Sequence, residues 1–396
     1  MNDPVVIVSL ARTPLGAFQG CLAELSSPQL GAFAIRAAVQ RAGIGPDAVQ
    51  EVLMGCVLPA GVGQAPTRQA ALGAGLPVSA GCTTISKVCG SGMKAVMMAH
   101  DLLVAGSSEV IVAGGMESMS NAPYLLPKAR AGLRLGHGSL LDHMFQDGLE
   151  DSYDRDTKGR LMGGFADDCA AHFGFTRHEQ DAFAIESTTR ARRAMQNGHF
   201  DFEIASVMVA GRHGEVPVMQ DEPPVKAQVE KVAGLKPAFS KDGTVTAANS
   251  SSISDGAAAL VLMRRSTAEA HGVTPLAAVA AHATHGHQPR WFTTAPVGAM
   301  RKVLERAAWG IADVDLWEIN EAFAVVTMAA MRELELAHER VNVNGGACAL
   351  GHPIGASGAR IIVTLISALR ARGARRGVAS LCIGGGEATA IALEMI

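Results

Sequence analysis

The sequence predicts an α/β fold made of two similar halves, with a separate domain inserted into the first half. Short apolar segments alternate with helical ones along most of the chain, which is typical of strands covered by helices on both faces. A stretch near the N-terminus is repeated in the last third, and the residues between about 119 and 252 fit neither copy. The 396 residues are sufficient for two or three domains of ordinary size.

Each element of the first half is predicted from a local pattern. Residues 4–8 are a continuous apolar run, and residues 109–113 are apolar after Glu109 and are stopped by Gly114-Gly115, so both indicate buried strands. Residues 29–42 are rich in alanine and stop at Gly43, which indicates a helix with a glycine cap. The same reasoning predicts a strand at 49–57, a helix at 90–104 and, once the chain returns to this half near Ser251, a last strand at 257–263.

The repeat relates residues 41–55 to residues 306–320 without a gap, an offset of 265 from residue 41 to residue 306. The same offset carries Gly90 onto Gly355 and carries Cys89 to a position two residues after His352. Farther along, the strand at 109–113 matches residues 378–382 only after about five inserted residues. If the halves pack about a pseudo-two-fold axis, their glycine-rich loops face each other, and we expect Cys89 and His352 in one site.

The intervening segment is predicted to be an inserted domain. It is richer in Gly, Asp and His, and it contains one clear helix, at about 176–198, opened by Thr176 with Glu179 three residues later. The predicted domains are therefore an N-terminal core domain of 1–118 plus 253–275, an inserted loop domain of 119–252, and a C-terminal core domain of 276–396.

Composition excludes several classes of function. The formal net charge is −3, which argues against a role on nucleic acid or on a membrane surface driven by net charge. No basic N-terminal leader and no apolar run of about 20 residues is visible. The seven cysteines are an odd number without a CxxC spacing, so we expect reduced thiols and a cytoplasmic location.

Four residues in unusual settings are candidates for chemistry. Cys89 lies where a glycine-rich loop enters a helix, a position that lowers the pKa of a thiol and allows close approach of a substrate, although a buried structural cysteine is the alternative. His352 lies in a second glycine-rich loop and is a natural base for a cysteine nucleophile. Cys382 ends an apolar strand before three glycines, whose N–H groups suit an oxyanion hole or a simple turn. Asn320 follows another strand and suits either an oxyanion contact or a helix N-cap.

Three further histidines, His282, His285 and His287, have a spacing that resembles a metal site. No carboxylate or thiol lies near them in the sequence, and we therefore predict no metal site.

Five motifs together resemble those of the thiolase family, over essentially the whole chain. They are Val88–Gly92, Gly114–Ser120, Asn320–Phe323, Gly351–Gly358 and Cys382–Gly386. The resemblance implies a thiolase-like fold, layered helix-sheet-helix-sheet-helix, with two core domains of one topology and a loop domain inserted in the first.

The resemblance also implies acetyl-CoA C-acetyltransferase activity, in which two acetyl-CoA molecules give acetoacetyl-CoA and CoA, or the reverse thiolytic cleavage of a 3-ketoacyl-CoA. Cys89 is then the acyl-thioester nucleophile, His352 the base that activates it, and Cys382 the proton acceptor and donor at the α-carbon. Asn320, through a water molecule, and His352 form one oxyanion hole, and the backbone N–H groups of Cys89 and Gly384 form the other. No metal or redox cofactor is implied.

The resemblance further implies that the CoA substrate lies across the loop domain. Positions that match the pantetheine tunnel are Ser251, Met162, Phe239 and Phe323. Three positions depart from the family pattern: Leu161 replaces a histidine of many short-chain members, Lys226 is a substitute for a missing arginine, and Phe292 follows Trp291 near an acyl-pocket position that is often methionine. These departures concern acyl chain length and CoA affinity.

The expected partners are acyl-CoA and CoA, and residues 119–145 match the part of the family that carries the contacts of a homotetramer. A longer-chain 3-ketoacyl-CoA thiolase of degradative fatty-acid metabolism is the alternative function. A ketoacyl synthase is a more remote one, since such enzymes do not need a cysteine before Gly-Gly-Gly. A non-catalytic lipid-binding relative is equally remote, because Cys89, His352 and Cys382 are all present.

Overall fold

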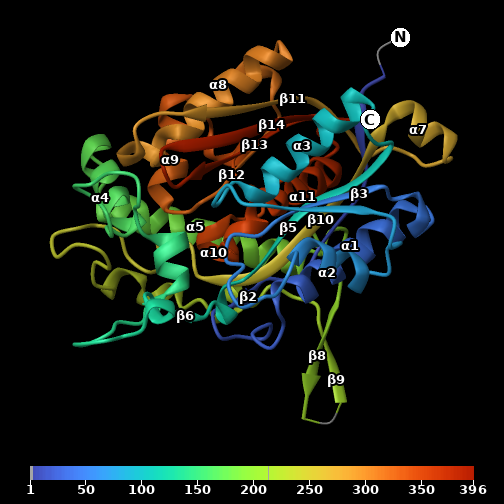
Figure 1. Ribbon diagram of the computed structural model, residues 1–396. Coiled ribbons are helices and arrows are strands. Elements are labelled where there is room, and N and C mark those ends of the chain that lie inside the picture. Colours follow the sequence, from blue (N-terminus) through green and yellow to red (C-terminus); the bar gives the residue numbers. More distant parts are fainter. Residues whose placement is uncertain (1–2, 213) are drawn as a thin grey trace.

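The computed structural model describes residues 3–212 and 214–396 (Figure 1). Its strands are β1 Val5–Arg12, β2 Gly16–Ala17, β3 Glu51–Gly55, β4 Gly81–Ile85, β5 Val110–Ser118, β6 Tyr124–Leu125, β7 Leu141–Asp142, β8 Val207–Gly211, β9 Gly214–Val218, β10 Ser254–Arg264, β11 Ala277–Gly286, β12 Leu316–Ile319, β13 Arg376–Ile383 and β14 Glu387–Met395. Its α-helices are α1 Ser27–Ala42, α2 Pro66–Gly73, α3 Ser91–Ala105, α4 Met162–Phe173, α5 Arg177–Gln196, α6 Glu222–Lys226, α7 Arg265–Ala270, α8 Ala295–Ala307, α9 Ala324–Glu333, α10 Ala347–Leu350 and α11 Ile354–Arg372.

The main sheet confirms the repeat found in the sequence. Its order is β12-β13-β14-β11-β1-β10-β5-β3-β4, so the run β3-β5-β10-β1 in the first half corresponds to β12-β13-β14-β11 in the second. In both runs the first two strands are parallel and the next two pairings are antiparallel. The halves are joined where β1 pairs with β11, at Val6 with Ala278 and Ile7 with Ala277.

Helices cover both half-sheets and also separate them, which confirms the predicted layering (Figure 1). Because side chains alternate across a strand, Val5 and Ile7 of β1 belong to the cluster that packs on α3 and α11, whereas Val6 and Val8 pack against α1. Helix α8 covers the outer face of the second half-sheet. The order of layers is thus α1 and α2, first half-sheet, α3 and α11, second half-sheet, then α8.

Helices α3 and α11 form the buried central layer. The stretches Val88–Ala105 and Ile354–Arg372 are long and apolar enough to cross a membrane by length and composition alone, but 50% and 89% of their residues are buried inside the protein. Both stretches pack into the core cluster between the two half-sheets, so their apolar composition is explained by burial in the protein interior.

Two local predictions were wrong. Strand β5 does not stop before Gly114-Gly115 but continues to Ser118. The glycines are needed inside the strand, because a Cβ at Gly114 would lie 2.0 Å from the carbonyl oxygen of Ala258 and one at Gly115 would lie 2.1 Å from that of Gly355. The segment 119–252 also contains α4, which precedes the predicted helix.

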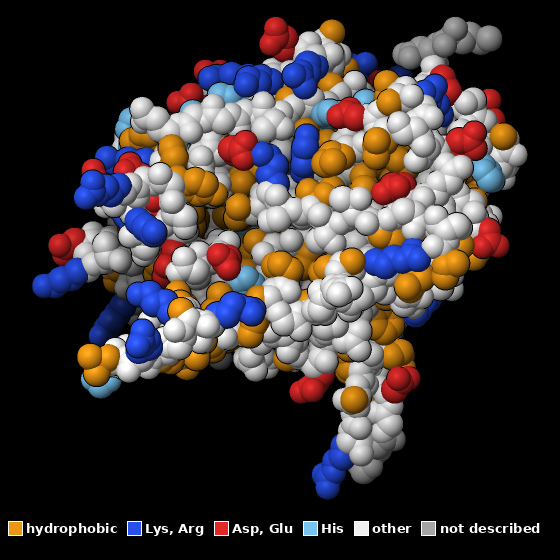
Figure 2. All heavy atoms as spheres, viewed as in Figure 1, with side chains coloured by type: hydrophobic (Ala, Val, Ile, Leu, Met, Phe, Trp, Pro, Cys, Tyr) orange, Lys and Arg blue, Asp and Glu red, His pale blue; other side chains and the backbone are white. Residues whose placement is uncertain are grey.

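The predicted helix in that segment is present as α5. Its first turn has the expected capping box, since the backbone N–H of Thr176 donates to Glu179 Oε2 over 2.7 Å and the N–H of Glu179 donates to Thr176 Oγ1 over 3.2 Å. The hairpin β8–β9 projects from the body of the molecule (Figure 1). On the face shown in Figure 2, basic and acidic side chains both occur over most of the surface, in keeping with the small net charge.

Candidate active site

Cys89 lies in a strained turn that ends at the first residue of α3. The preceding residue, Val88, has a φ of 46°, which is a costly left-handed conformation for a β-branched side chain. Ser91 holds the turn closed, because its hydroxyl donates to the carbonyl of Val88 over 2.6 Å and accepts the N–H of Lys87 over 2.8 Å. The strained backbone at Val88 and the two hydrogen bonds of Ser91 therefore fix the position of Cys89.

Cys382 lies at the end of β13, next to the turn that leads into β14. The turn requires glycine, since Gly385 and Gly386 have φ values of 92° and 83°. Cys382 is close enough to Cys89 that a negative charge on the Cys89 sulfur raises the pKa of Cys382. The N–H of Gly384 and that of Cys89 itself both face the Cys89 sulfur, where they lower its pKa. The structure therefore brings both thiols and both predicted oxyanion donors together.

The central helices bring the His352 loop to the Cys89 loop. The contact is made by glycines that lie three residues after each candidate: a Cβ at Gly92 would lie 3.0 Å from the carbonyl oxygen of Gly355. A Cβ at Gly358 would lie 2.3 Å from the backbone nitrogen of the residue after Gly92. Helices α3 and α11 thus touch backbone to backbone at their first turns, as the repeat predicted.

His352 is buried and held through both ring nitrogens. Its Nδ1 lies 2.5 Å from the hydroxyl oxygen of Ser357, and that hydroxyl donates its single proton to the carbonyl of Pro353 over 2.9 Å. The short contact is therefore made by Nδ1–H, which leaves the lone pair on Nε2, 3.5 Å from Nδ2 of Asn320. Burial, reinforced by the positive charge of Arg360, lowers the pKa of His352 to about 3, so the ring is a neutral base at physiological pH.

The amide of Asn320 is oriented by a buried ion pair. Arg360 donates to Asn320 Oδ1 over 3.4 Å and pairs with Glu318 over 2.9 Å, with both charged side chains almost fully buried. Because the oxygen of the amide faces the guanidinium, its NH₂ group faces His352. Burial raises the pKa of Glu318 to about 8, and Arg360 opposes that shift. Helix α9 is capped at Phe323, so Asn320 is not an N-cap.

The protonation of the thiols differs from the expectation for Cys89. Although Cys89 lies at the start of a helix, burial raises its pKa to about 11, and the two facing N–H groups offset only part of that shift. Burial also raises the pKa of Cys382 well above its ordinary value, with a further contribution from Cys89. Both residues are therefore neutral thiols in the free protein.

An apolar wall lies beside Cys382 and contains most of the predicted pocket residues. Met162, Phe239, Phe292 and Phe323 pack in one cluster with Cys382. The rings of Phe239 and Phe323 meet edge to face at a centroid distance of 5.9 Å, and those of Phe292 and Phe323 at 6.5 Å.

Two further predicted residues lie on the segments that border this wall. The N–H of Ser251 donates to the carbonyl of Ala322 over 2.9 Å, and the next residue, Ser252, accepts the N–H of His352 over 3.0 Å, so Ser251 lies on a segment between the aromatic wall and the histidine. Leu161 is placed one residue before Met162, at the start of α4.

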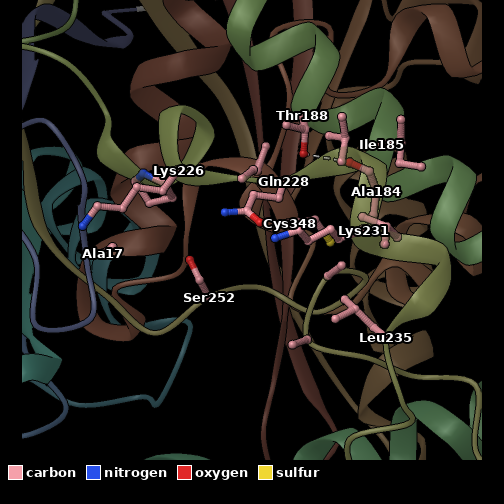
Figure 3. A pocket seen from close by; sticks show the side chains of 17 residues that line it. Ala17, Ala184, Ile185, Thr188, Lys226, Gln228, Lys231, Leu235, Ser252 and Cys348 are labelled. Carbon is pink, nitrogen blue, oxygen red and sulfur yellow. Dashed lines mark hydrogen bonds between the residues drawn. The ribbon is translucent and has the colours of Figure 1, made fainter.

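Lys226 lies apart from these residues, on a cavity of about 420 Å³. The walls are formed by α5, by the segment 223–235 and by residues 247–252 and 348–349. Figure 3 shows Lys226, Gln228, Lys231 and Ser252 among the side chains that line the cavity. Ser252, whose carbonyl accepts the N–H of His352, thus borders both this cavity and the loop of His352.

Three residues that support the site were missed by sequence reasoning: Ser357, Arg360 and Glu117. Glu117 is buried in β5 and accepts the N–H groups of Val57, Leu58 and Gly355, which fastens the histidine loop to the first half. Arg360 and Glu117 had a detectable signal, because Glu117 is the one charge in β5 and Arg360 the one charge in the buried part of α11, before the arginines of its last turn. Ser357 had none beyond its position five residues after His352.

Comparisons with known proteins agree with this geometry. Residues 5–266 match the model of the thiolase N-terminal domain and residues 273–395 that of the thiolase C-terminal domain. The chain is 49% identical to an acetyl-CoA acetyltransferase of Cupriavidus necator over 396 residues, covering 100% of both chains, and 49% identical to that of Escherichia coli over 393 residues, covering 99% of each. The crystal structure of the Bacillus anthracis acetyl-CoA acetyltransferase has a TM-score of 0.96 at 42% identity, covering 100% of this chain and 99% of that one. Sequence, topology and the convergence of the five motifs thus agree, and the chain belongs to the thiolase family.

Proposed function

We propose that this protein is an acyltransferase that condenses two molecules of acetyl-CoA to acetoacetyl-CoA and CoA, and that catalyses the reverse thiolysis. One observation carries the proposal: the Cys89 thiol lies against the N–H groups that suit a thioester oxygen, with a second thiol, Cys382, beside it. The names of the relatives at 49% identity support the same substrate.

In the acylation step, the Cys89 sulfur forms a bond to the carbonyl carbon of acetyl-CoA, and the bond from that carbon to the CoA sulfur breaks. The Cys89 proton moves to Nε2 of His352, whose lone pair is exposed by the contact of Nδ1 with Ser357. The departing CoA sulfur takes the proton of Cys382. The N–H groups of Cys89 and Gly384 stabilise the negative oxygen of the tetrahedral intermediate.

In the condensation step, the Cys382 thiolate removes an α-proton from a second acetyl-CoA. Asn320, acting through a water molecule, and the protonated His352 stabilise the enolate oxygen. The α-carbon then forms a bond to the acetyl carbonyl carbon while the bond to the Cys89 sulfur breaks, and that sulfur recovers its proton from His352. Both thiols and the imidazole return to their starting states.

The shifted pKa values suit these exchanges. A thiol whose pKa is raised by burial gives a thiolate of high proton affinity, which is what removal of a weakly acidic α-proton by Cys382 requires. The low pKa of His352 means that it holds a proton only while negative charge is close by and then returns it to Cys89. Because both thiols rest in the neutral form, proton transfer accompanies the attack instead of preceding it.

The CoA portion of the substrate is proposed to occupy the cavity beside the catalytic loops. Lys226 and Lys231 at its opening suit phosphate groups, while the Ala184, Ile185 and Leu235 side chains suit the adenine and pantetheine portions. Ser251, Met162, Phe239 and Phe323 are proposed to line the path from this cavity to the thiols. No metal or redox cofactor enters the proposed steps.

A short acyl group is favoured over a longer one. Phe292 is almost fully buried next to Cys382 and packs on Phe323, so bulky rings occupy the space in which a long acyl chain would extend. This favours acetyl-CoA condensation over the thiolysis of longer 3-ketoacyl-CoA. Leu161, at the start of α4, adds another apolar side chain in place of the histidine of many short-chain members.

Labelling with radioactive acetyl-CoA tests the assignment of the two thiols. Cys89→Ala is expected to take up no acetyl group, and Cys382→Ala is expected to take up one acetyl group while losing condensation and exchange of α-protons with solvent. Cys82→Ala, which removes another partly exposed thiol, is the control and should behave as the unmodified protein. Labelling of Cys89→Ala, or condensation at an undiminished rate by Cys382→Ala, would show that the roles are wrong.

We further propose that residues 119–252 act as one inserted domain between core domains 1–118 plus 253–275 and 276–396, and that the protein is a homotetramer. The segment 119–145 carries large apolar side chains that are exposed, namely Leu126 at 46%, Leu133 at 51%, Leu135 at 99% and Leu140 at 65% exposure, which suits a contact between subunits. The seven free cysteines suit a reducing compartment and hence the cytoplasm. Sedimentation of the protein with and without Leu135→Ser tests the tetramer, and a monomer in both cases would contradict it.

A further inference from the structure

Two imidazoles and a carboxylate meet towards the C-terminal end of α3, away from the glycine contacts at its first turn. His100 and Asp101 lie in the last turns of α3, and His282 lies on β11 of the other half. The sequence placed His282 only with His285 and His287, where no carboxylate was near, but the fold supplies Asp101 from a segment 181 residues away. These three side chains have no part in the acyl transfer proposed above.

The three donor atoms form a small triangle. His282 Nε2 lies 2.9 Å from Asp101 Oδ1 and 3.2 Å from His100 Nδ1, and the last two atoms are 3.1 Å apart. A tetrahedral ion with bonds of about 2.1 Å separates its ligands by about 3.4 Å, and an octahedral one separates neighbouring ligands by about 3.0 Å. The triangle therefore has almost the size that a bound transition-metal ion needs, with only small movements of the side chains.

The imidazole rings of His100 and His282 are also oriented so that their nitrogens could bind one ion, and they are not stacked on each other. The two imidazoles meet nearly edge to face, at 82° with centroids 4.9 Å apart, so their nitrogens converge on the carboxylate oxygen. The side chains of His100 and His282 are largely covered, whereas that of Asp101 is 57% exposed. One side of the triangle is thus open to water, which can complete the coordination of an ion.

We propose that His100, Asp101 and His282 form a binding site for a divalent transition-metal ion of the zinc class, with water in the remaining positions. Two imidazoles and one carboxylate are a donor set that favours Zn²⁺ and its neighbours over Mg²⁺ or Ca²⁺, which prefer oxygen ligands. The ion would link α3, whose first turn follows Cys89, to β11 of the other half.

Two features set the expected strength of the site at a moderate level. Imidazoles that bind metal tightly usually donate their other N–H to an acceptor, but within residues 3–212 and 214–396 the buried Nδ1 of His282 has no hydrogen-bond partner. Two cations also lie near: Arg306 donates to the carbonyl of His282 over 2.6 Å, and Lys94 is close enough to affect His282 electrostatically. We therefore expect a dissociation constant in the micromolar range and not the tight binding of a closed four-ligand site.

The test is a titration of the full-length protein, first freed of metal with a chelator, with Zn²⁺ in a calorimeter and with Co²⁺ in a spectrophotometer. One equivalent of each ion is expected to bind, with Co²⁺ giving visible bands of nitrogen and oxygen coordination, and Zn²⁺ should raise the midpoint of thermal unfolding. His282→Gln and Asp101→Asn are each expected to weaken binding at least tenfold. His285→Gln, three residues along the same strand, is the matched control and should bind as the unmodified protein does.

Three results would overturn the proposal. One is the absence of binding below millimolar metal. Another is equal binding by His282→Gln, Asp101→Asn and His285→Gln, and the third is a thiolate charge-transfer band of Co²⁺, which would place the ion on cysteines. If His282→Gln is poorly folded by circular dichroism before metal is added, His100→Asn replaces it as the second ligand variant, with the same expected loss of binding.

Discussion

The contact between Ser357 and His352 predicts that a single hydroxyl determines whether the histidine can act as a base. In Ser357→Ala, Nδ1 of His352 loses its partner at 2.5 Å and remains buried. The ring can then keep an unpaired Nδ1–H, or it can move the proton to Nε2 and lose the lone pair that faces Asn320. The first outcome raises the free energy of the tautomer that accepts the proton of Cys89, and the second removes that tautomer.

The size of the effect follows from the cost of a buried donor without an acceptor, about 1–3 kcal/mol. At about 1.4 kcal/mol for each factor of ten, kcat/KM for thiolysis of acetoacetyl-CoA should fall roughly 5- to 150-fold. Because Ser357 does not line the cavity proposed for CoA, the dissociation constant for CoA should stay the same. The acylation of Cys89 should slow by the same factor as kcat/KM when it is followed in a single turnover.

The same helix offers a matched control. Ser367 also donates its hydroxyl to the carbonyl four residues earlier, that of Val363, over 3.0 Å and is also buried, but among the residues that the structure describes its hydroxyl contacts no histidine. Ser367→Ala therefore removes the same hydrogen bond within α11 as Ser357→Ala does, and it should leave kcat/KM unchanged. If both variants lose activity equally, the effect comes from helix stability, and the argument from the orientation of His352 is refuted.

Three other predictions concern the wall, the support of the histidine loop and the CoA cavity. Phe292→Ala should lower the free energy of unfolding by about 3–5 kcal/mol, because it leaves a cavity in a buried cluster, and it should shift thiolysis towards longer 3-ketoacyl-CoA; an unchanged chain-length preference would contradict the proposed pocket. Burial raises the pKa of Glu117 from about 4.5 in the unfolded chain to about 7, so only the folded state keeps its proton between these values and stability falls as pH rises through them, by roughly 3 kcal/mol. Glu117→Gln should remove this part of the pH dependence when denaturant unfolding is compared at pH 4.5 and pH 8, and identical slopes would show that another group is responsible. Lys226→Ala should raise KM for acetyl-CoA several-fold with little change in kcat, more at low salt than at high salt, and a fall in kcat alone would exclude a phosphate contact.

The arrangement of the halves was predictable because the repeat is a local pattern that needs no tertiary information. An offset of 265 residues placed the loops of Gly90 and Gly355 at equivalent points, and a pseudo-symmetric pairing of halves then required them to meet. The strand that continues through Gly114-Gly115 was not predictable in this way. A glycine pair ends a strand in most contexts, and only the neighbouring carbonyls of Ala258 and Gly355 reveal that these two are needed for close packing.

The protonation states and the supporting residues also depend on contacts that a local pattern does not contain. The helix start at Cys89 indicated a lowered pKa, but the depth of the loop decides the balance, and burial raises the pKa instead. Likewise His282 was noted in the sequence only for its spacing to His285 and His287, and nothing there connected it with Asp101; the two come together because α3 packs between the half-sheets. Such pairs become visible only when the path of the whole chain is known.

The backbone contact of α3 with α11 has a consequence for how this protein can change over time. Gly92 and Gly358 leave no room for even a methyl group between the helices, so a substitution at either would push α3 and α11 apart and separate Cys89 from His352. A side chain at Gly355 would instead meet Glu117 and push the start of α11 away from the first half-sheet. The aromatic wall, in contrast, is made of side chains such as Phe292 that can be exchanged for others without moving the backbone. We therefore expect tolerated substitutions to fall in the aromatic wall and to change the preferred acyl group. The glycines, which have no side chain, keep the loops of Cys89 and His352 in contact.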